Sequence, residues 1–242
     1  MGQKKKNIEE IKNIELPQDI TKCGFLRRFP YKFADEQLEY IKAIWDSKNT
    51  GIFVNSKAGT SKTSVAVGMG ILMTREFQLY DKMYYIINPS TEVDSIGYLP
   101  GSAEMKAAEF MTPLYQSVLL WGYDPNQCII SENNMDAAKS GTAFIEAIPE
   151  TFLRGATLDN AYIIIDEFEN FDMRRAKKTL TRVGKNCKVV VLGCYSQCDL
   201  KYSGDSALPK YLNAASNCDF LKIIDLKKNY RSDFSSWADE VQ

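Results

Sequence analysis

Short apolar runs alternate with amphipathic stretches along most of this chain. Runs of this length, bounded by polar residues, predict buried strands. They lie at 51–54, 83–87, 143–148, 162–165, 188–192 and 222–226. Two of them are almost wholly apolar, as is typical of strands covered on both faces of a parallel sheet.

The segments between these runs favour helices. Leu38, Ile41, Ile44 and Trp45 recur at helical spacing. Further helical segments are expected at 65–72, near 104–120, near 172–183 and near 207–216. This alternation predicts an α/β fold, a mostly parallel sheet with helices on both faces and right-handed crossovers.

The composition is that of an ordinary globular protein of 242 residues, 45% hydrophobic and 25% charged. Residues 1–22 predict a polar N-terminal arm, residues 23–242 a single domain, and the polar stretch 124–140 a loop or insertion. A net charge of −1 argues against a grip on nucleic acid by the whole molecule but leaves a local basic patch open. Because no apolar run is long enough to span a membrane, we expect a cytoplasmic protein without membrane contact.

The chain has six cysteines and no histidine. None of the cysteines forms a C-x-x-C pair, so reduced and mostly buried thiols are expected rather than a zinc site. The lack of histidine excludes Ser-His and Cys-His catalysis.

A phosphate loop is predicted between the run at 51–54 and the helix that follows. The loop residues that would bind nucleotide are Ser56, Lys57, Ala58, Gly59, Thr60, Ser61, Lys62 and Thr63. Backbone N–H groups of such a loop and of the helix N-terminus point at phosphate oxygens. Lys62 would reach the β- and γ-phosphates of ATP, and the Thr63 hydroxyl would bind Mg²⁺.

This loop departs from the pattern GxxxxGK[ST], because serine stands at both outer glycine positions, 56 and 61. A serine held in the left-handed conformation costs roughly 1–2 kcal/mol, and an altered phosphate geometry would affect hydrolysis more than binding. Lys57 has the spacing of the extra lysine of partition-type ATPases, which reaches a partner's nucleotide. The alternative is a surface lysine.

Three later segments supply candidate catalytic groups. The run at 162–165 ends in Asp166 and Glu167, at the kind of strand end where ligands bind in open α/β sheets. Asp166 would hold Mg²⁺ through water, and Glu167 would orient and deprotonate the attacking water. Gln197 follows the run at 188–192 and could sense the γ-phosphate. Arg231 follows the last run and is a candidate arginine finger.

In this order the motifs resemble those of the PhoH-like ATPases, over roughly residues 35–240. The resemblance is carried by Gln37, the loop at 56–63, Gly97–Gly101, Pro113–Tyr115, Phe152–Leu158, Ile165–Glu167 and Leu180–Gly184. It implies a RecA-like core, a ring-like homo-oligomer and a link to RNA or single-stranded DNA. It also implies that Gln37 reads the adenine, that Tyr230 stacks on it and that Arg231 reaches a nucleotide on a neighbouring subunit.

The chain also departs from the pattern of this family. Its acid motif reads DEFEN over Asp166–Asn170, where the family has DEAQN; Cys194 replaces an aspartate and Asn88 an arginine. These changes leave nucleotide binding expected and bear on the rate of turnover.

These motifs and departures leave three candidate functions. The first is an oligomeric, helicase-like ATPase that acts on RNA or single-stranded DNA. The second is a nucleotide-dependent switch or scaffold with slow or absent hydrolysis, and the third is a partition-type dimeric ATPase. A basic cluster could face nucleic acid or be a solvated helix face. It consists of Arg174, Arg175, Lys177, Lys178, Arg182, Lys185 and Lys188.

Overall fold

The computed structural model describes residues 16–88, 111–131 and 134–232, together with residues 234 and 237. Each of the six apolar runs forms a strand, and the strands pair in parallel in the order β3-β2-β4-β5-β1-β6. Their bounds are β1 Gly51–Ser56, β2 Lys82–Ile87, β3 Ile145–Pro149, β4 Ala161–Ile165, β5 Lys188–Gly193 and β6 Leu221–Leu226. The predicted α/β fold is thereby confirmed.

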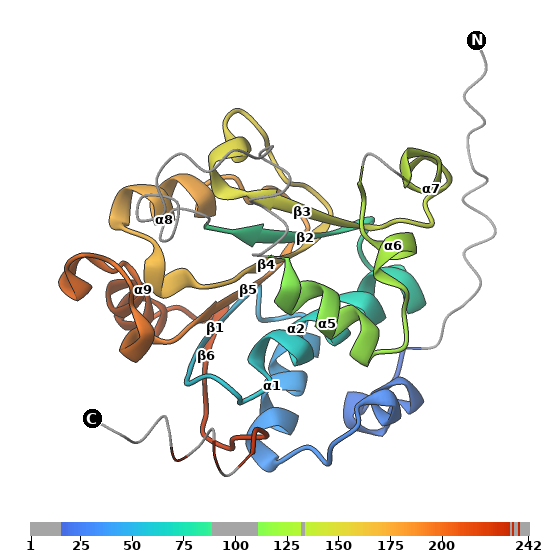
Figure 1. Cartoon of the computed structure of the whole chain (residues 1–242), viewed down its shortest axis with the longest axis horizontal. Coiled ribbons are helices and arrows are strands. Elements are labelled where there is room, and N and C mark those ends of the chain that lie inside the picture. Colours follow the sequence, from blue (N-terminus) through green and yellow to red (C-terminus); the bar gives the residue numbers. More distant parts are fainter. Residues whose placement is uncertain (1–15, 89–110, 132–133, 233, 235–236, 238–242) are drawn as a thin grey trace.

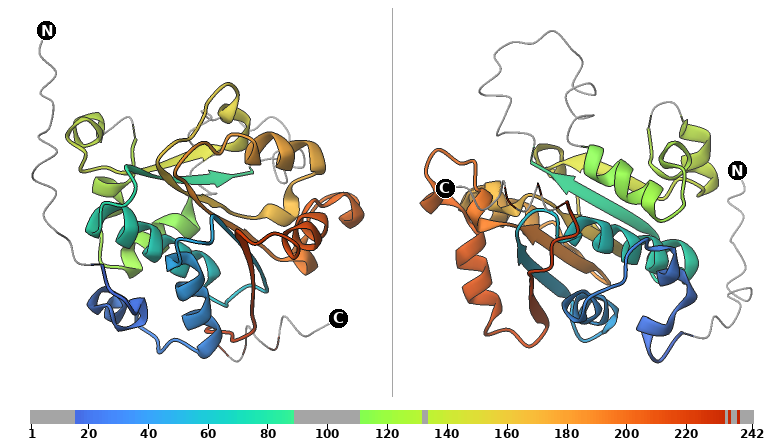
Figure 2. Two further views of the ribbon diagram at one scale, coloured as in Figure 1. Left: turned by 180° about the vertical axis from the view of Figure 1, so that it is seen from behind. Right: turned by 60° about the horizontal axis from the view of Figure 1, so that its bottom comes forward.

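Helices cover both faces of the sheet (Figure 1). One face carries α1 Asp35–Trp45, α2 Lys62–Ile71 and α5 Thr112–Leu120, and the other carries α8 Met173–Leu180 and α9 Leu208–Ala215. Figure 2 shows the two layers from other sides. Side chains of successive strand residues point to opposite faces, so Ile52 and Val54 join the core under α1 and α2, whereas Phe53 joins the core under α9.

Shorter elements connect these layers. They are η2 Ile20–Lys22, η3 Gly24–Arg28, η4 Leu72–Glu76, α6 Pro125–Cys128, α7 Met135–Ser140, η6 Glu150–Leu153, η7 Phe168–Asn170, η8 Tyr195–Gln197 and η9 Ser203–Asp205. Three of them come after the carboxyl ends of strands. The element η6 directly follows β3, whereas η7 and η8 begin shortly after the ends of β4 and β5.

The helix that follows the phosphate loop, α2, is held closely against the end of α5. The indole N–H of Trp121 donates to the carbonyl oxygen of Ser64 at 2.7 Å. Gly68 lets the indole approach, because a Cβ at this position would lie 2.0 Å from the Trp121 ring. This packing fixes the direction of α2 and therefore of the loop at its N-terminus.

Two expectations from the sequence change, and several others fall on residues that the structure does not describe. The stretch 124–140 contains the short helices α6 and α7, which are too short to show a helical period in the sequence. Residues 16–22 of the expected arm pack on the domain, since Ile20 is buried in its core. The start of the helix expected from 104, the segment Gly97–Gly101 and residues 1–15 lie outside the described residues.

Candidate active site

The carboxyl ends of β1, β5 and β4 meet at one edge of the sheet, because these strands are parallel neighbours. The phosphate loop follows β1, and Asp166 and Glu167 follow β4. The strand β5 lies between them and leads to η8, which contains Gln197. The fold thus brings the loop, the acid pair and the candidate sensor to a common edge, the place where open parallel sheets bind ligands.

Only one of the two serines in the phosphate loop adopts a strained backbone. Ser61 has φ 63° and ψ 22°, in the left-handed region, directly before α2. Ser56 does not have a positive φ; it ends β1, and its hydroxyl lies 2.9 Å from that of Thr60. The Lys62 ammonium donates to the Ser56 carbonyl at 3.4 Å, so the lysine side chain folds back over the loop.

The segment after β6 lies on the phosphate loop of the same chain. The Tyr230 N–H donates to the Gly59 carbonyl at 2.8 Å. Gly59 has φ 81°, and a Cβ there would lie 2.3 Å from Asn229 Oδ1 and 3.0 Å from Arg231 Cδ. The Arg231 side chain is exposed and lies beside its own loop, which the sequence did not indicate.

Gln37 and Tyr230 are bonded to each other. The Tyr230 hydroxyl donates to Gln37 Oε1 at 3.0 Å, and this oxygen also accepts from the Ala34 N–H at 3.0 Å. Gln37 Nε2 donates to the Thr60 carbonyl at 3.5 Å. Gln37 is fully buried. It therefore links the phosphate loop to the segment after β6, and its role in reading adenine stays a prediction.

Asp166 is the centre of a small hydrogen-bond network. Its Oδ2 accepts from the Thr63 hydroxyl at 3.1 Å and from the Tyr85 hydroxyl at 2.5 Å, and its Oδ1 accepts from the Glu167 N–H at 3.0 Å. The two expected Mg²⁺ ligands, Thr63 and Asp166, are thus in contact across 103 positions of sequence. A hydroxyl beside a carboxylate is the oxygen set that Mg²⁺ uses in nucleotide sites, where it keeps waters and substrate phosphates as further ligands.

Tyr85 is a site residue that the sequence analysis missed. It lies in an apolar run and belongs to no motif. Its place near the end of a predicted strand is therefore the only feature of the sequence that could have indicated a role in the site. Burial, followed by the charge of Asp166, raises the pKa of its hydroxyl well above the usual value. The hydroxyl therefore stays a donor over the working range of pH.

Glu167 has an unusual backbone and a perturbed carboxyl. Its φ of 53° is left-handed, a conformation that non-glycine residues adopt at some cost and that is found at functional sites. Burial raises the pKa of its carboxyl, the charge of Asp166 raises it further, and Lys62 lowers it. A carboxylate with a raised pKa is a stronger base, which suits proton abstraction from water.

The loop after β5 contains Cys194 and the candidate sensor Gln197. The Cys194 thiol is buried and lies 3.1 Å from the Ser196 hydroxyl. Gln197 is half-buried, and its backbone N–H donates to the Cys194 carbonyl at 2.9 Å. Its position between the loop after β1 and the acids after β4 fits a sensor, and this role stays a prediction.

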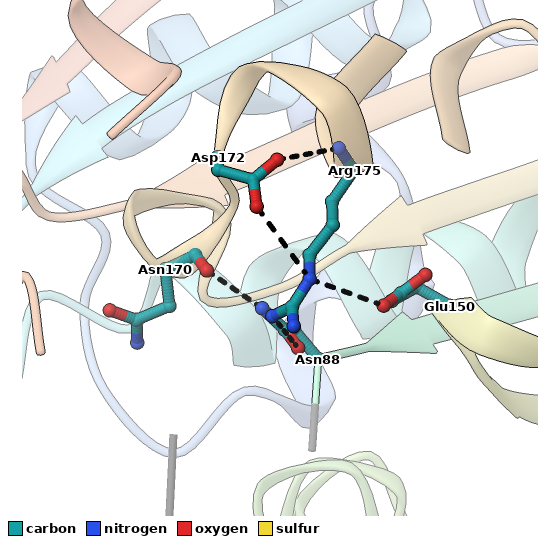
Figure 3. Close-up of polar contacts among 5 residues, drawn as sticks. All are labelled: Asn88, Glu150, Asn170, Asp172 and Arg175. Carbon is teal, nitrogen blue, oxygen red and sulfur yellow. Dashed lines mark hydrogen bonds and ion pairs between the residues drawn. The ribbon is translucent and has the colours of Figure 1, made fainter. Parts of the chain in front are cut away.

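The basic cluster does not form one surface. Arg175 donates from Nη1 to Asn88 Oδ1 at 3.5 Å, and its Nε lies 3.9 Å from Glu150 and 3.8 Å from Asp172 (Figure 3). Asn88 also donates to the Asn170 carbonyl at 2.7 Å. These contacts attach α8 to the ends of β2 and β3, so Arg175 has a structural role.

Lys188 likewise lies away from the site. It begins β5, at the amino edge of the sheet, and is buried. Its ammonium donates to the carbonyl of Asp46 at 2.8 Å and to that of Asn49. Burial lowers the pKa of Lys188 to about 8. Lys188 therefore fits neither alternative considered for the basic cluster, a nucleic-acid face or a solvated helix face, because it is buried.

A parallel sheet with a phosphate loop after β1, an acid pair after β4 and a strand between them defines a P-loop NTPase fold. The comparisons identify the family. The sequence profile of the PhoH-like protein family matches residues 32–239, and the chain belongs to that family. The resemblance stated from the motifs is confirmed.

The chain is 34% identical to Protein PhoH2 of Bacillus subtilis over 149 residues, 60% of this chain and 32% of that protein. It is 29% identical to a PhoH-like protein of the same bacterium over 223 residues, 92% of this chain and 66% of that protein. Protein PhoH of Escherichia coli is 30% identical over 199 residues, 80% of this chain and 52% of that protein. The chain thus spans about one to two thirds of the length of these relatives.

Solved structures with a similar fold include a DEAD box protein of Methanococcus jannaschii, with a TM-score of 0.47 and 17% identity, covering 89% of this chain and 55% of that one. Another is a Sulfolobus solfataricus SWI2/SNF2 ATPase core in complex with dsDNA, with a TM-score of 0.47 and 13% identity, covering 82% and 45%. At these values the fold assignment rests on the strand order of this chain itself. Among the described residues no helix is both long and apolar enough to cross a bilayer.

Proposed function

We propose that this protein binds ATP with Mg²⁺ at the edge formed by β1, β5 and β4 and hydrolyses it. The observation that carries the proposal is the contact of Thr63 Oγ1 with Asp166 Oδ2 at 3.1 Å. It joins the residue after the loop lysine to the first acid of the pair after β4. Chance motifs 103 positions apart have no reason to meet in this way.

Each group of site residues has a separate role in ATP binding and hydrolysis. The N–H groups at the start of α2 and the Lys62 ammonium bind the β- and γ-phosphates. Thr63 and Asp166 hold Mg²⁺, which neutralises charge on the phosphate oxygens when it is bound. Glu167 takes a proton from the attacking water as the bond between the γ-phosphorus and the bridging oxygen breaks. Gln197 hydrogen-bonds to the γ-phosphate or to this water.

Arg231 supplies positive charge to the same site. Because its side chain lies against Gly59 of its own chain, we propose that it acts on the nucleotide of its own subunit. The expectation from the resemblance, an arginine finger that reaches a neighbouring subunit of a ring, is the alternative. We further propose that Tyr230 and Gln37 release each other to receive the adenine.

The proposed partner is RNA or single-stranded DNA, with the chain acting as a homo-oligomer. In support, Phe152 on η6 is 70% exposed, and Arg154, two positions further along the chain, is also exposed. The contact of Arg175 with Glu150 keeps α8, with its exposed Arg174 and Lys177, beside η6. Exposed aromatic rings among cations are the usual means of binding single strands, by stacking and phosphate contact.

The testing experiment is phosphate release from ATP and Mg²⁺, with and without single-stranded RNA and DNA. Glu167→Gln is the control, since it keeps the shape of the base and removes its proton affinity. Turnover that nucleic acid stimulates and that Glu167→Gln abolishes supports the proposal. Phe152→Ala should remove the stimulation and spare the basal rate.

Tight ATP binding without turnover in the same assay would favour the nucleotide-dependent switch or scaffold. The left-handed Ser61 in the phosphate loop is the observation in favour of that second candidate. The third candidate, a partition-type dimer, requires Lys57→Ala to abolish ATP-dependent dimerisation.

A further inference from the structure

The backbone that leaves the sheet after β6 is held by a side chain of α1. The ladder between β1 and β6 ends at the pair Ser56 and Leu226, and the N–H groups that follow still need acceptors. Lys227 and Lys228 donate theirs to a single carboxylate oxygen, Oε1 of Glu36, at 2.7 and 2.5 Å. Glu36 lies in the first turn of α1, 191 positions earlier. One carboxylate thus takes over where the ladder stops.

The next three residues connect this point to the phosphate loop. Asn229 Oδ1 accepts from the Arg231 N–H at 2.8 Å and closes a tight turn. The Tyr230 N–H donates to the Gly59 carbonyl at 2.8 Å, and a Cβ on Gly59 would lie 3.0 Å from both Cγ and Cδ of Arg231. The backbone of residues 227–231 is therefore fixed by Glu36 at one end and by the loop at the other. The place of the Arg231 side chain follows from these two attachments.

A second contact joins the same two elements and is of a weaker kind. Glu39, one turn further along α1, pairs with Lys222 of β6 at 3.3 Å, and both side chains are largely exposed. Exposed ion pairs contribute little to stability, whereas hydrogen bonds from N–H groups to a carboxylate are among the stronger ones. Glu36 also differs in what it holds, because its partners are backbone groups of the segment that carries Arg231. Glu39 therefore offers a matched control.

We propose that Glu36 is a positioning residue for hydrolysis, which acts through Arg231 by holding the segment 227–231 on the phosphate loop. The inference rests on the proposed function, in which Arg231 supplies positive charge at the nucleotide. Without the two bonds to Glu36, the segment keeps its bond to Gly59 but loses its attachment to α1. The guanidinium then has no fixed position, and charge that is not preorganised stabilises a transition state poorly.

The first test measures kcat and KM for ATP in Glu36→Ala, Glu36→Gln and Glu39→Ala. We expect Glu36→Ala to lower kcat about tenfold and to change KM less than about twofold, because the displaced charge acts in the transition state. Glu36→Gln keeps an acceptor oxygen and should recover most of the rate. Glu39→Ala should behave as the wild type. A wild-type kcat in Glu36→Ala, or the same loss in Glu39→Ala, would overturn the proposal.

A double substitution shows whether Glu36 acts through Arg231. Residues that work as one unit have effects that do not add. In a protein that already carries Arg231→Ala, the further change Glu36→Ala should therefore leave kcat unchanged. If it lowers kcat by the same factor as in the wild type, Glu36 acts independently of Arg231 and the proposal is wrong.

Amide hydrogen exchange separates this inference from the proposed function, because it requires no turnover. Exchange at the amides of Lys227 and Lys228 reports directly on the two N–H groups that Glu36 accepts. We expect both amides to exchange at least about tenfold faster in Glu36→Ala and at the wild-type rate in Glu39→Ala. If the wild type hydrolyses no ATP, the proposed function fails, and faster exchange in Glu36→Ala still supports the attachment. Unchanged exchange in Glu36→Ala would overturn the inference even in an active ATPase.

Discussion

The Tyr85 hydroxyl donates a hydrogen bond of 2.5 Å to Asp166 Oδ2, the same oxygen that accepts from Thr63. Tyr85 lies on β2, opposite Ile164 of the adjacent strand β4, and it is fully buried. The carboxylate assigned to Mg²⁺ is thus oriented from inside the core. Because the hydroxyls of Tyr85 and Thr63 share this acceptor, removal of the Tyr85 hydroxyl should affect both stability and Mg²⁺ binding.

We expect Tyr85→Phe to lower the free energy of unfolding by about 1–2 kcal/mol, because Asp166 loses a buried donor. It should also raise the Mg²⁺ concentration that gives half-maximal ATP hydrolysis. The matched control is Tyr162→Phe, which removes a buried hydroxyl that donates to the Ala66 carbonyl at 2.9 Å, away from the acids. Both variants should lose stability in urea unfolding. An equal shift in Mg²⁺ dependence in the two would contradict the assignment of Asp166.

The two serines of the phosphate loop should respond to glycine with opposite signs. Ser61→Gly relieves a left-handed serine and should stabilise the fold by about 0.5–1 kcal/mol, after allowance for the added freedom of the unfolded chain. Ser56→Gly removes the contact with the Thr60 hydroxyl and should destabilise the fold by about 1 kcal/mol. Urea unfolding of the two variants measures both values. If both substitutions change the free energy of unfolding in the same direction, backbone strain at Ser61 does not account for a difference between the two positions.

Mixing of variants distinguishes the two roles considered for Arg231. We expect Arg231→Ala to lower kcat with little loss of ATP affinity, because the guanidinium acts on charge that develops in the transition state. Arg231→Ala mixed with Lys62→Ala should give no more activity than the sum of the two alone if Arg231 serves its own subunit. Activity recovered above that sum would show that it serves a neighbour.

Lys188 should impose a pH dependence far from the site. Its pKa in the folded chain is about 8, and in the unfolded chain it is about 10.4. The unfolded state therefore binds more protons between these values, so stability should rise with pH, by roughly 1–2 kcal/mol between pH 8 and 10. Lys188→Met should flatten this rise, and the exposed Lys210→Met should keep it. Urea unfolding at several pH values gives the comparison.

Local patterns were sufficient for the elements and the main motifs. The run at 162–165 became β4, and Asp166 and Glu167 stand at its end as expected. Apolar periodicity and loop composition act over a few residues, so they can be read without knowing the rest of the chain. The same holds for the left-handed serine at 61, which followed from the glycine that a phosphate loop normally has there.

The contacts that decide the chemistry depend on which strands are neighbours, and no local pattern specifies that. Tyr85 reaches Asp166 because β2 pairs with β4, and Arg231 lies on Gly59 because β6 pairs with β1. Gln197 lies between the phosphate loop and the acid pair because β5 runs between β1 and β4. The sequence by itself determined the strands, the phosphate loop and the acid pair. Only the tertiary structure decided which side chains surround them, since that depends on the order and register of parallel strands far apart in the chain.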